Sequence, residues 1–176
     1  MPMPNHHPLY SLLGKLMLEL FGEREWALRL PALVFGVFTP PLLFVFGSRW
    51  VNRRAGVLAG LFMCCAKWPV WFSQDARGYS AMIFFSLLST HLFLLLNERA
   101  SRPRLAVYFL SSALAVYSHF YAAAVIGSQL LIGGALAGRN ESRASGRSLF
   151  IASLLALAAA LALYAPLASD FYHFTM

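Results

Sequence analysis

Long apolar runs, separated by short segments that carry arginine, dominate the sequence. Each run holds at most one acidic or basic side chain. Because a helix of about 20 apolar residues crosses the roughly 30 Å hydrocarbon layer of a bilayer, the pattern predicts about six transmembrane helices. They are expected at residues 30–48, 55–73, 78–97, 105–118, 121–138 and 148–168. The fold class predicted is all-α, a polytopic membrane helix bundle, forming one domain over residues 1–176.

Two of these helices come from a single apolar run. The run from Leu105 to Gly138 is too long for one spanning helix and too short for two full ones. A tight reversal near residues 118–120 resolves the mismatch, since it gives two short helices.

The N-terminal stretch has a different pattern. Apolar residues recur there at steps of three and four, whereas Ser11, Lys15 and Glu19 share another face. This periodicity is typical of an amphipathic helix, expected over residues 8–22. We expect it to lie along the outer membrane surface with its apolar face toward the lipid, to pack against the bundle, or to do both.

The composition excludes a water-soluble domain. Hydrophobic residues make up 59% of the chain and charged residues 12%, with a mean hydropathy of +0.63. The net charge of +7 does not indicate nucleic acid, because the basic residues are spread between apolar runs and form no patch with interleaved aromatics. The adjacent Cys64 and Cys65 are interpreted as packing residues, since neighbouring cysteines rarely form an unstrained disulfide.

The distribution of basic residues predicts the orientation. Loops 49–54, 97–104 and 139–147 hold nine arginines. The alternate side holds Lys15, Arg24, Arg29 and Arg77, with Lys67 just inside a predicted span. The positive-inside rule therefore predicts arginine loops in the cytoplasm, and the N-terminus, residues 74–79 and the C-terminus on the outside.

Candidate chemistry gathers at the outward junction between the second and third predicted spans. Asp75 and Arg77 lie there with Gln74 and Tyr79. One interpretation is a polar turn that meets water. The other is an outward pocket in which Arg77 holds an anionic group and Asp75 accepts a proton or orients a substrate hydroxyl.

Further polar residues allow similar alternatives. Lys67 either extends to the lipid headgroups or meets a lipid-linked phosphate as a point charge. His119 lies at the predicted reversal, as a turn residue or a pocket residue. His6 and His7 could supply a ligand or an acid, but no third ligand stands at a suitable spacing, so no metal site is predicted.

Three segments resemble successive motifs of bacterial glycosyltransferase family 39, the dolichyl-phosphate-mannose-protein mannosyltransferase-like and lipid A aminoarabinose transferase-like proteins of the GT-C superfamily. They are NHHPLYSLL at 5–13, EWALRLPA at 25–32 and WFSQDARGY at 71–79. The resemblance extends from about Asn5 to the final span.

The resemblance implies transfer of a sugar, with inversion at the anomeric carbon, from a polyprenyl-phosphate donor to a lipid or protein acceptor. The enzyme would lie in the bacterial cytoplasmic membrane with its active face outward, in contact with membrane lipids, and would need no cofactor within this chain. Asp75 and Arg77 would be the catalytic residues. The substrate-binding residues would be His6, His7, Lys67, Gln74, Tyr79 and His119.

The sequence also departs from the family pattern. Family members have an additional first spanning helix and an outer loop whose acidic residue is taken as the catalytic base, and Asp75 is not its counterpart. The expectation is therefore a glycosyltransferase lacking these elements, or a non-catalytic remnant of one. A transporter or flippase subunit, with Asp75, Arg77 and Lys67 along an ion or lipid pathway, is the alternative from another class.

Overall fold

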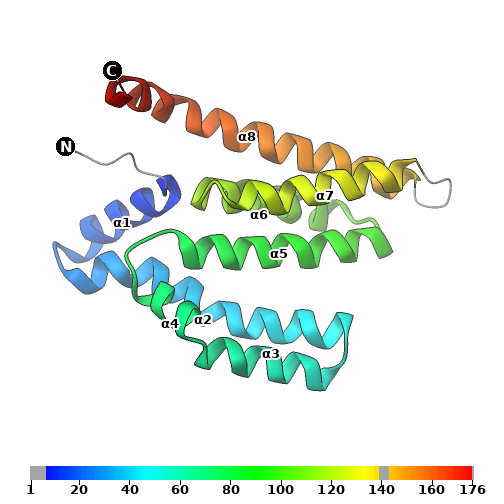
Figure 1. Cartoon of the computed structure of the whole chain (residues 1–176), viewed down its shortest axis with the longest axis horizontal. Coiled ribbons are helices and arrows are strands. Elements are labelled where there is room, and N and C mark those ends of the chain that lie inside the picture. Colours follow the sequence, from blue (N-terminus) through cyan, green and yellow to red (C-terminus); the bar gives the residue numbers. More distant parts are fainter. Residues whose placement is uncertain (1–6, 139–142, 176) are drawn as a thin grey trace.

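A computed structural model of the chain describes residues 7–138 and 143–175, and these residues form eight helices and no strand. The helices are α1 (Pro8–Phe21), α2 (Glu25–Trp50), α3 (Arg53–Cys65), α4 (Lys67–Gln74), α5 (Tyr79–Glu98), α6 (Arg102–Ser118), α7 (Ala122–Ala137) and α8 (Arg143–Thr175). Figure 1 shows the longer helices running alongside one another. The all-α bundle with an N-terminal amphipathic helix, predicted from hydropathy, is confirmed.

The connections fall at two ends of the bundle (Figure 1). The arginine end consists of residues 49–54, residues 98–104 and the start of α8. The opposite end, here the site end, holds the start of α1, residues 75–78 and residues 119–121. At the arginine end, Arg49 near the end of α2 forms a salt bridge with Glu98 at the end of α5, with 2.5 Å between Nη2 and Oε2. Basic loops that are far apart in the sequence are therefore neighbours in space.

The number of helices able to cross a bilayer differs from the predicted six. Within the described residues, α2, α5 and residues 146–164 of α8 are long and apolar enough, and α3 with α4 makes a fourth if the bent pair is one span. The helices α6 and α7 have 17 and 16 residues, below the roughly 20 residues of a typical span. That these two helices cross the membrane stays a prediction.

The predicted span 55–73 is divided into two helices. Helix α3 ends at Cys65, α4 begins at Lys67, and the two axes differ by 57°. Pro69 provides the physical reason, because it has no N–H to donate to the Cys65 carbonyl and its ring would clash with that carbonyl in a continuous helix. The chain bends before the proline, and Ala66 adopts an extended conformation there.

Helices α2 and α3 form a tight antiparallel pair. A Cβ added at Gly47 would lie 2.8 Å from the Cα of Gly56, so the two backbones touch. Close backbone approach at small residues is how membrane helices gain packing energy without a hydrophobic driving force. The side chain of Asn52 accepts a hydrogen bond from the Ala55 N–H at 2.9 Å and caps the start of α3.

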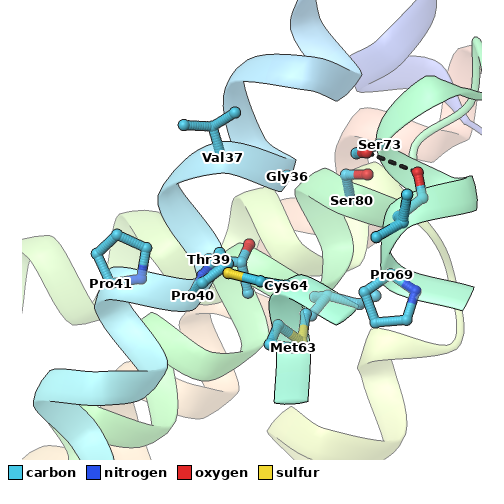
Figure 2. A pocket seen from close by; sticks show the side chains of 12 residues that line it. Gly36, Val37, Thr39, Pro40, Pro41, Met63, Cys64, Pro69, Ser73 and Ser80 are labelled. Carbon is cyan, nitrogen blue, oxygen red and sulfur yellow. Dashed lines mark hydrogen bonds between the residues drawn. The ribbon is translucent and has the colours of Figure 1, made fainter. Parts of the chain in front are cut away.

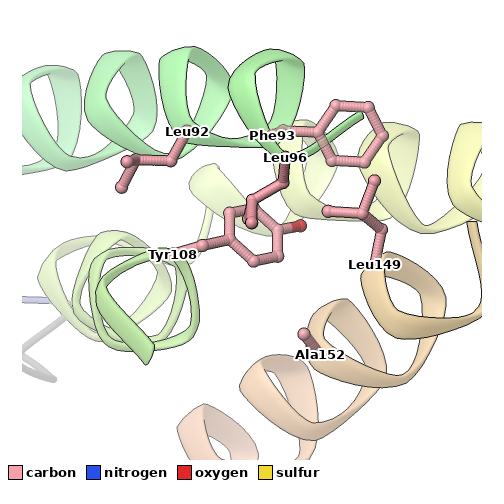
Figure 3. Close-up of a cluster of buried hydrophobic side chains, with 6 residues drawn as sticks. All are labelled: Leu92, Phe93, Leu96, Tyr108, Leu149 and Ala152. Atoms are coloured by element: carbon pink, nitrogen blue, oxygen red, sulfur yellow. The ribbon is translucent and has the colours of Figure 1, made fainter. Parts of the chain in front are cut away.

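The core between α5, α6 and α8 is apolar toward the arginine end. Figure 3 shows Leu92, Phe93, Leu96, Tyr108, Leu149 and Ala152 converging there. The Tyr108 hydroxyl donates to Gln129 Oε1 at 3.0 Å and lies 2.5 Å from Ser153 Oγ. The Gln129 amide donates in turn to Ser89 and Thr90. These bonds connect the four helices α5–α8 through groups that lipid could not satisfy.

Candidate functional site

Three segments from distant parts of the sequence meet at the site end. His7 directly precedes α1, Gly78 and Tyr79 begin α5, and His119 follows α6. Since α6 ends and α7 begins at the end where α5 begins, the short turn after Ser118 reaches the turn that follows α4. The fold therefore brings together residues that the sequence separates by more than a hundred positions.

The side chains there form a cluster of rings, the aromatic cluster (His7, Phe72, Tyr79, His119 and Tyr121). Tyr79 and His119 stack, with centroids 5.2 Å apart and planes inclined by 28°. The His7 ring lies 4.9 Å from that of Tyr79 and 4.8 Å from that of His119. Phe72 packs on Tyr79 at 4.8 Å and Tyr121 on His119 at 4.6 Å. Two imidazoles thus share one aromatic environment.

Backbone contacts fix these rings in place. A Cβ added at Gly78 would lie 2.5 Å from the Ser118 carbonyl oxygen and 3.1 Å from His7 Nδ1. Only glycine therefore allows this approach. The Tyr121 N–H donates to His119 Nδ1 at 3.2 Å. Because Nδ1 accepts that bond, the neutral His119 ring carries its proton on Nε2.

Asp75 and Arg77 occupy the turn between α4 and α5. Arg77 Nε lies 3.6 Å from Asp75 Oδ2, and the two side chains are 57% and 25% exposed, respectively. Asp75 Oδ2 is buried and accepts no hydrogen bond from a described residue. The exposed part of the guanidinium can receive an oxyanion, and guanidinium groups bind phosphate oxygens through paired N–H donors.

Tyr10 is a neighbour of this pair that the sequence did not identify. Its side chain is 5% exposed, and its hydroxyl donates to the Leu28 carbonyl, joining α1 to α2. Burial, and then the negative charge of Asp75, raises the pKa of Tyr10 to about 12. The only sequence signal was its place inside the NHHPLYSLL segment, where it occupies the apolar side of the predicted helix.

The predicted site residues separate into two groups. His7, Tyr79 and His119 lie in contact, and Asp75 and Arg77 pair in the adjoining turn. Lys67 is not brought to them: it begins α4, about 12 Å along the helix axis from Asp75, with its ammonium 5.7 Å from the Trp68 ring. Exposed Gln74 ends α4, and His6 lies outside the described residues.

An apolar cleft of about 370 Å³ lies between α2, α3, α4 and α5. Figure 2 shows it, with proline rings from α2 and α4 on its walls and the Ser73 and Ser80 hydroxyls toward one side. Pro40 and Pro41 donate no helical hydrogen bond, so the Gly36 and Val37 carbonyls lose their usual donors beside this cleft. Hydropathy could not find the cleft, because residues of four helices line it.

Potential metal ligands are not clustered within residues 7–138 and 143–175. No group of three or more His, Cys, Asp or Glu side chains comes close enough there to hold an ion. The two imidazoles of the aromatic cluster have ring partners, and a catalytic zinc site takes three protein ligands.

Comparison with known families identifies the relationship of the chain. The sequence profile described as dolichyl-phosphate-mannose-protein mannosyltransferase matches residues 5–169. The chain belongs to this family. Searches of curated proteins and of solved structures give no match.

The dolichyl-phosphate-mannose-protein mannosyltransferase match covers all three motif segments and every described residue of the aromatic cluster. It confirms the resemblance noted from those motifs and supports a membrane glycosyltransferase of the GT-C type.

Proposed function

We propose that this protein transfers a sugar from a polyprenyl-phosphate donor to a lipid or protein acceptor on the outward face of the membrane. The observation that carries the proposal is the Asp75–Arg77 pair beside the His7, Tyr79 and His119 rings, in a chain of this family. These groups lie at the site end, opposite the arginine end. By the positive-inside rule that end faces away from the cytoplasm.

Arg77 supplies the charge that the reaction needs. The acceptor oxygen bonds to the anomeric carbon as the bond from that carbon to the phosphate oxygen breaks, and polyprenyl phosphate leaves with an additional negative charge. A guanidinium already positioned at the developing charge stabilises the transition state more than the ground state. The 3.6 Å contact with Asp75 holds the guanidinium in the turn and leaves its exposed part for the phosphate.

Asp75 and the aromatic cluster act on the other substrate groups. The acceptor hydroxyl must lose its proton, and the half-buried Asp75 carboxylate is the candidate acceptor in this turn, where it also orients the hydroxyl. The partly exposed Tyr79 ring offers a surface for the sugar ring, and the buried His119 stacks on Tyr79 and holds it in position.

The lipid portion of the donor has a matching surface. The cleft between α2 and α5 is mainly apolar, and its polar Ser73 and Ser80 lie on the two sides of the Asp75 turn, at the end of α4 and at the start of α5. An isoprenoid chain in this cleft would place its phosphate toward that turn.

The test is transfer by membranes that contain the chain. Membranes are incubated with a set of polyprenyl-phosphate hexoses and pentoses and with lipid and protein acceptors, and labelled product is counted. Arg77→Ala should lower transfer by about 100-fold or more, the usual effect of removing one donor to a developing charge.

Arg24→Ala is the matched control. Arg24 is exposed, lies just before α2, and has the same charge as Arg77, so its removal should leave transfer within twofold of the wild type, a small margin for residual long-range charge effects. Transfer unchanged by Arg77→Ala would contradict the site. Absence of transfer from every donor, by wild-type membranes, would contradict the function.

A further inference from the structure

A second, smaller cleft lies at the arginine end, between α5, α6 and α8. Its volume is about 120 Å³, and it is lined by Leu96, Ala100, Ser101, Arg102, Leu105, Ser148 and Leu149. None of these residues belongs to the candidate site, which is at the opposite end of the bundle. The cleft is therefore separate from the candidate site.

The floor of this cleft is apolar. Leu96 and Leu149 are almost fully buried and belong to the cluster in Figure 3, and the partly buried Leu105 packs against that cluster. Three leucines from three helices thus form a surface continuous with the core. A soluble anion would gain nothing from such a surface, whereas an acyl chain would bury apolar area against it.

The rim of the cleft is polar and cationic. Arg102 is exposed and makes no ion pair with a described residue. Glu98, the one acidic side chain at this end within the described ranges, is already bound to Arg49. Ser101 precedes α6, but its side chain caps no backbone N–H of that helix. A cation and a hydroxyl therefore face the mouth of an apolar cleft.

The charge around the cleft is strongly one-sided. Besides Arg49 and Arg102, the exposed arginines among the described side chains at this end are Arg53, Arg54, Arg99, Arg104 and Arg147. Basic clefts between membrane helices, at the level of the headgroups, are suited to anionic lipids. The combination of a leucine floor with an arginine rim matches a molecule that is itself half apolar and half anionic.

We propose that this cleft binds one anionic glycerophospholipid. Its phosphate contacts the Arg102 guanidinium and the Ser101 hydroxyl, and the first part of an acyl chain lies on Leu96, Leu105 and Leu149. The lipid fills the space where α5, α6 and α8 diverge and holds the three helices together. This proposal does not depend on the proposed sugar transfer.

The test titrates the purified full chain, in a mild detergent, with phosphatidylglycerol or with phosphatidylcholine of the same acyl chains, and counts bound lipid by native mass spectrometry. Phosphatidylglycerol should bind at least fivefold more tightly. Arg102→Gln should weaken phosphatidylglycerol binding by about fivefold, equivalent to about 1 kcal/mol, and phosphatidylcholine binding by less, because the choline cation offsets the charge of its phosphate. Inorganic phosphate at constant ionic strength should not displace the lipid.

Arg53→Gln is the matched control, because Arg53 lies exposed at the same end, starts α3, and does not line the cleft. It should change the affinity by less than twofold, since a single exposed charge outside the site is largely screened. Equal losses in the two variants would show diffuse attraction to the arginine end and overturn the proposal, as would equal affinity for the two lipids.

Ala100→Trp tests the cleft without changing charge. Ala100 is exposed and lines the cleft, so an indole there should fill the mouth and remove the bound phosphatidylglycerol while the helical circular-dichroism spectrum is retained. A variant that is equally helical and keeps wild-type lipid binding would also overturn the proposal.

Discussion

The hydroxyl of Tyr10 joins α1 to α2 in the electrostatic neighbourhood of Asp75. It is nearly buried and donates to the Leu28 carbonyl, and the nearby Asp75 carboxylate makes ionisation of the tyrosine unfavourable. A tyrosine on the apolar side of an amphipathic helix gives no sign of this in the sequence. The structure thus adds a residue that holds α1 against the bundle beside the candidate site.

The raised pKa of Tyr10 predicts a pH dependence of stability. A group whose pKa rises on folding stabilises the protein below its unfolded value, near 10, and that contribution disappears as the pH passes the folded value, about 12. Ionised Tyr10 should therefore cost the folded state about 2–3 kcal/mol. At neutral pH, Tyr10→Phe should lose only the hydrogen bond, about 1 kcal/mol.

The measurement is the free energy of unfolding of wild type and Tyr10→Phe in mild detergent from pH 7 to 12.5. The wild type should be the more stable protein at pH 7 to 9 and the less stable one above pH 12. A difference that stays constant across this range would contradict the role of Tyr10, whatever other groups titrate, since those groups are common to both proteins.

At the scale of the helix, proline interrupts the apolar segment of α3 and α4 but does not interrupt α2. Pro40 and Pro41 lie within α2 without ending it, whereas the chain breaks just before Pro69. Helix-breaking residues are tolerated in membrane helices where neighbours satisfy the freed backbone groups, and the sequence does not reveal those neighbours. Hydropathy therefore predicted the apolar run of 55–73 but not its bend.

The site divides in the same way between what the sequence predicts and what it does not. Alternating spans placed residues 74–79 and His119 on one side of the membrane, and that side is one end of the bundle in the structure. Their contact depends on Gly78, whose missing Cβ lets α5 begin against the Ser118 carbonyl. The need for glycine at position 78 arises only when the start of α5 meets the end of α6, so it is not visible in the sequence of either segment alone.

Gly78→Ala should separate these segments. The added methyl would meet the Ser118 carbonyl oxygen at 2.5 Å, and overpacking of this kind costs about 1–3 kcal/mol. The melting temperature in detergent should fall. Transfer activity should fall with it, because His7 and Tyr79 lose their positions next to His119.

Gly127→Ala is the matched control, since nothing lies within 4 Å of a Cβ added there. In the interior of α7 it should raise stability by about 0.5–1 kcal/mol, the difference in helix propensity between alanine and glycine. A Gly78→Ala protein that melts at or above the wild-type temperature would show that the close approach is not required.

The whole molecule is electrically asymmetric along the bundle axis. Seven arginines whose side chains the structure describes lie at one end. The opposite end carries exposed aromatic residues, among them Phe21, Trp26, Phe120 and Tyr121, and aromatic side chains are enriched where a bilayer meets water. The candidate site and the proposed lipid cleft lie at these two different ends.

This asymmetry predicts the orientation of the protein, which chemical labelling can measure. With Cys64 and Cys65 replaced by alanine, Phe120→Cys should react with a membrane-impermeant maleimide in intact cells, because Phe120 is exposed at the site end. Val51→Cys, exposed at the arginine end, should react only after permeabilisation. The reverse labelling would contradict the outward site and leave the helix bundle unaffected.

The turn of Val51 and Asn52 bears on how the chain enters the membrane during synthesis. It joins α2 to α3 through two residues and is closed by the Asn52 cap, and Gly47 and Gly56 then touch directly beside it. These contacts are local in sequence, and local contacts form early. We therefore expect α2 and α3 to pair and insert as one helical hairpin before α5 has left the ribosome.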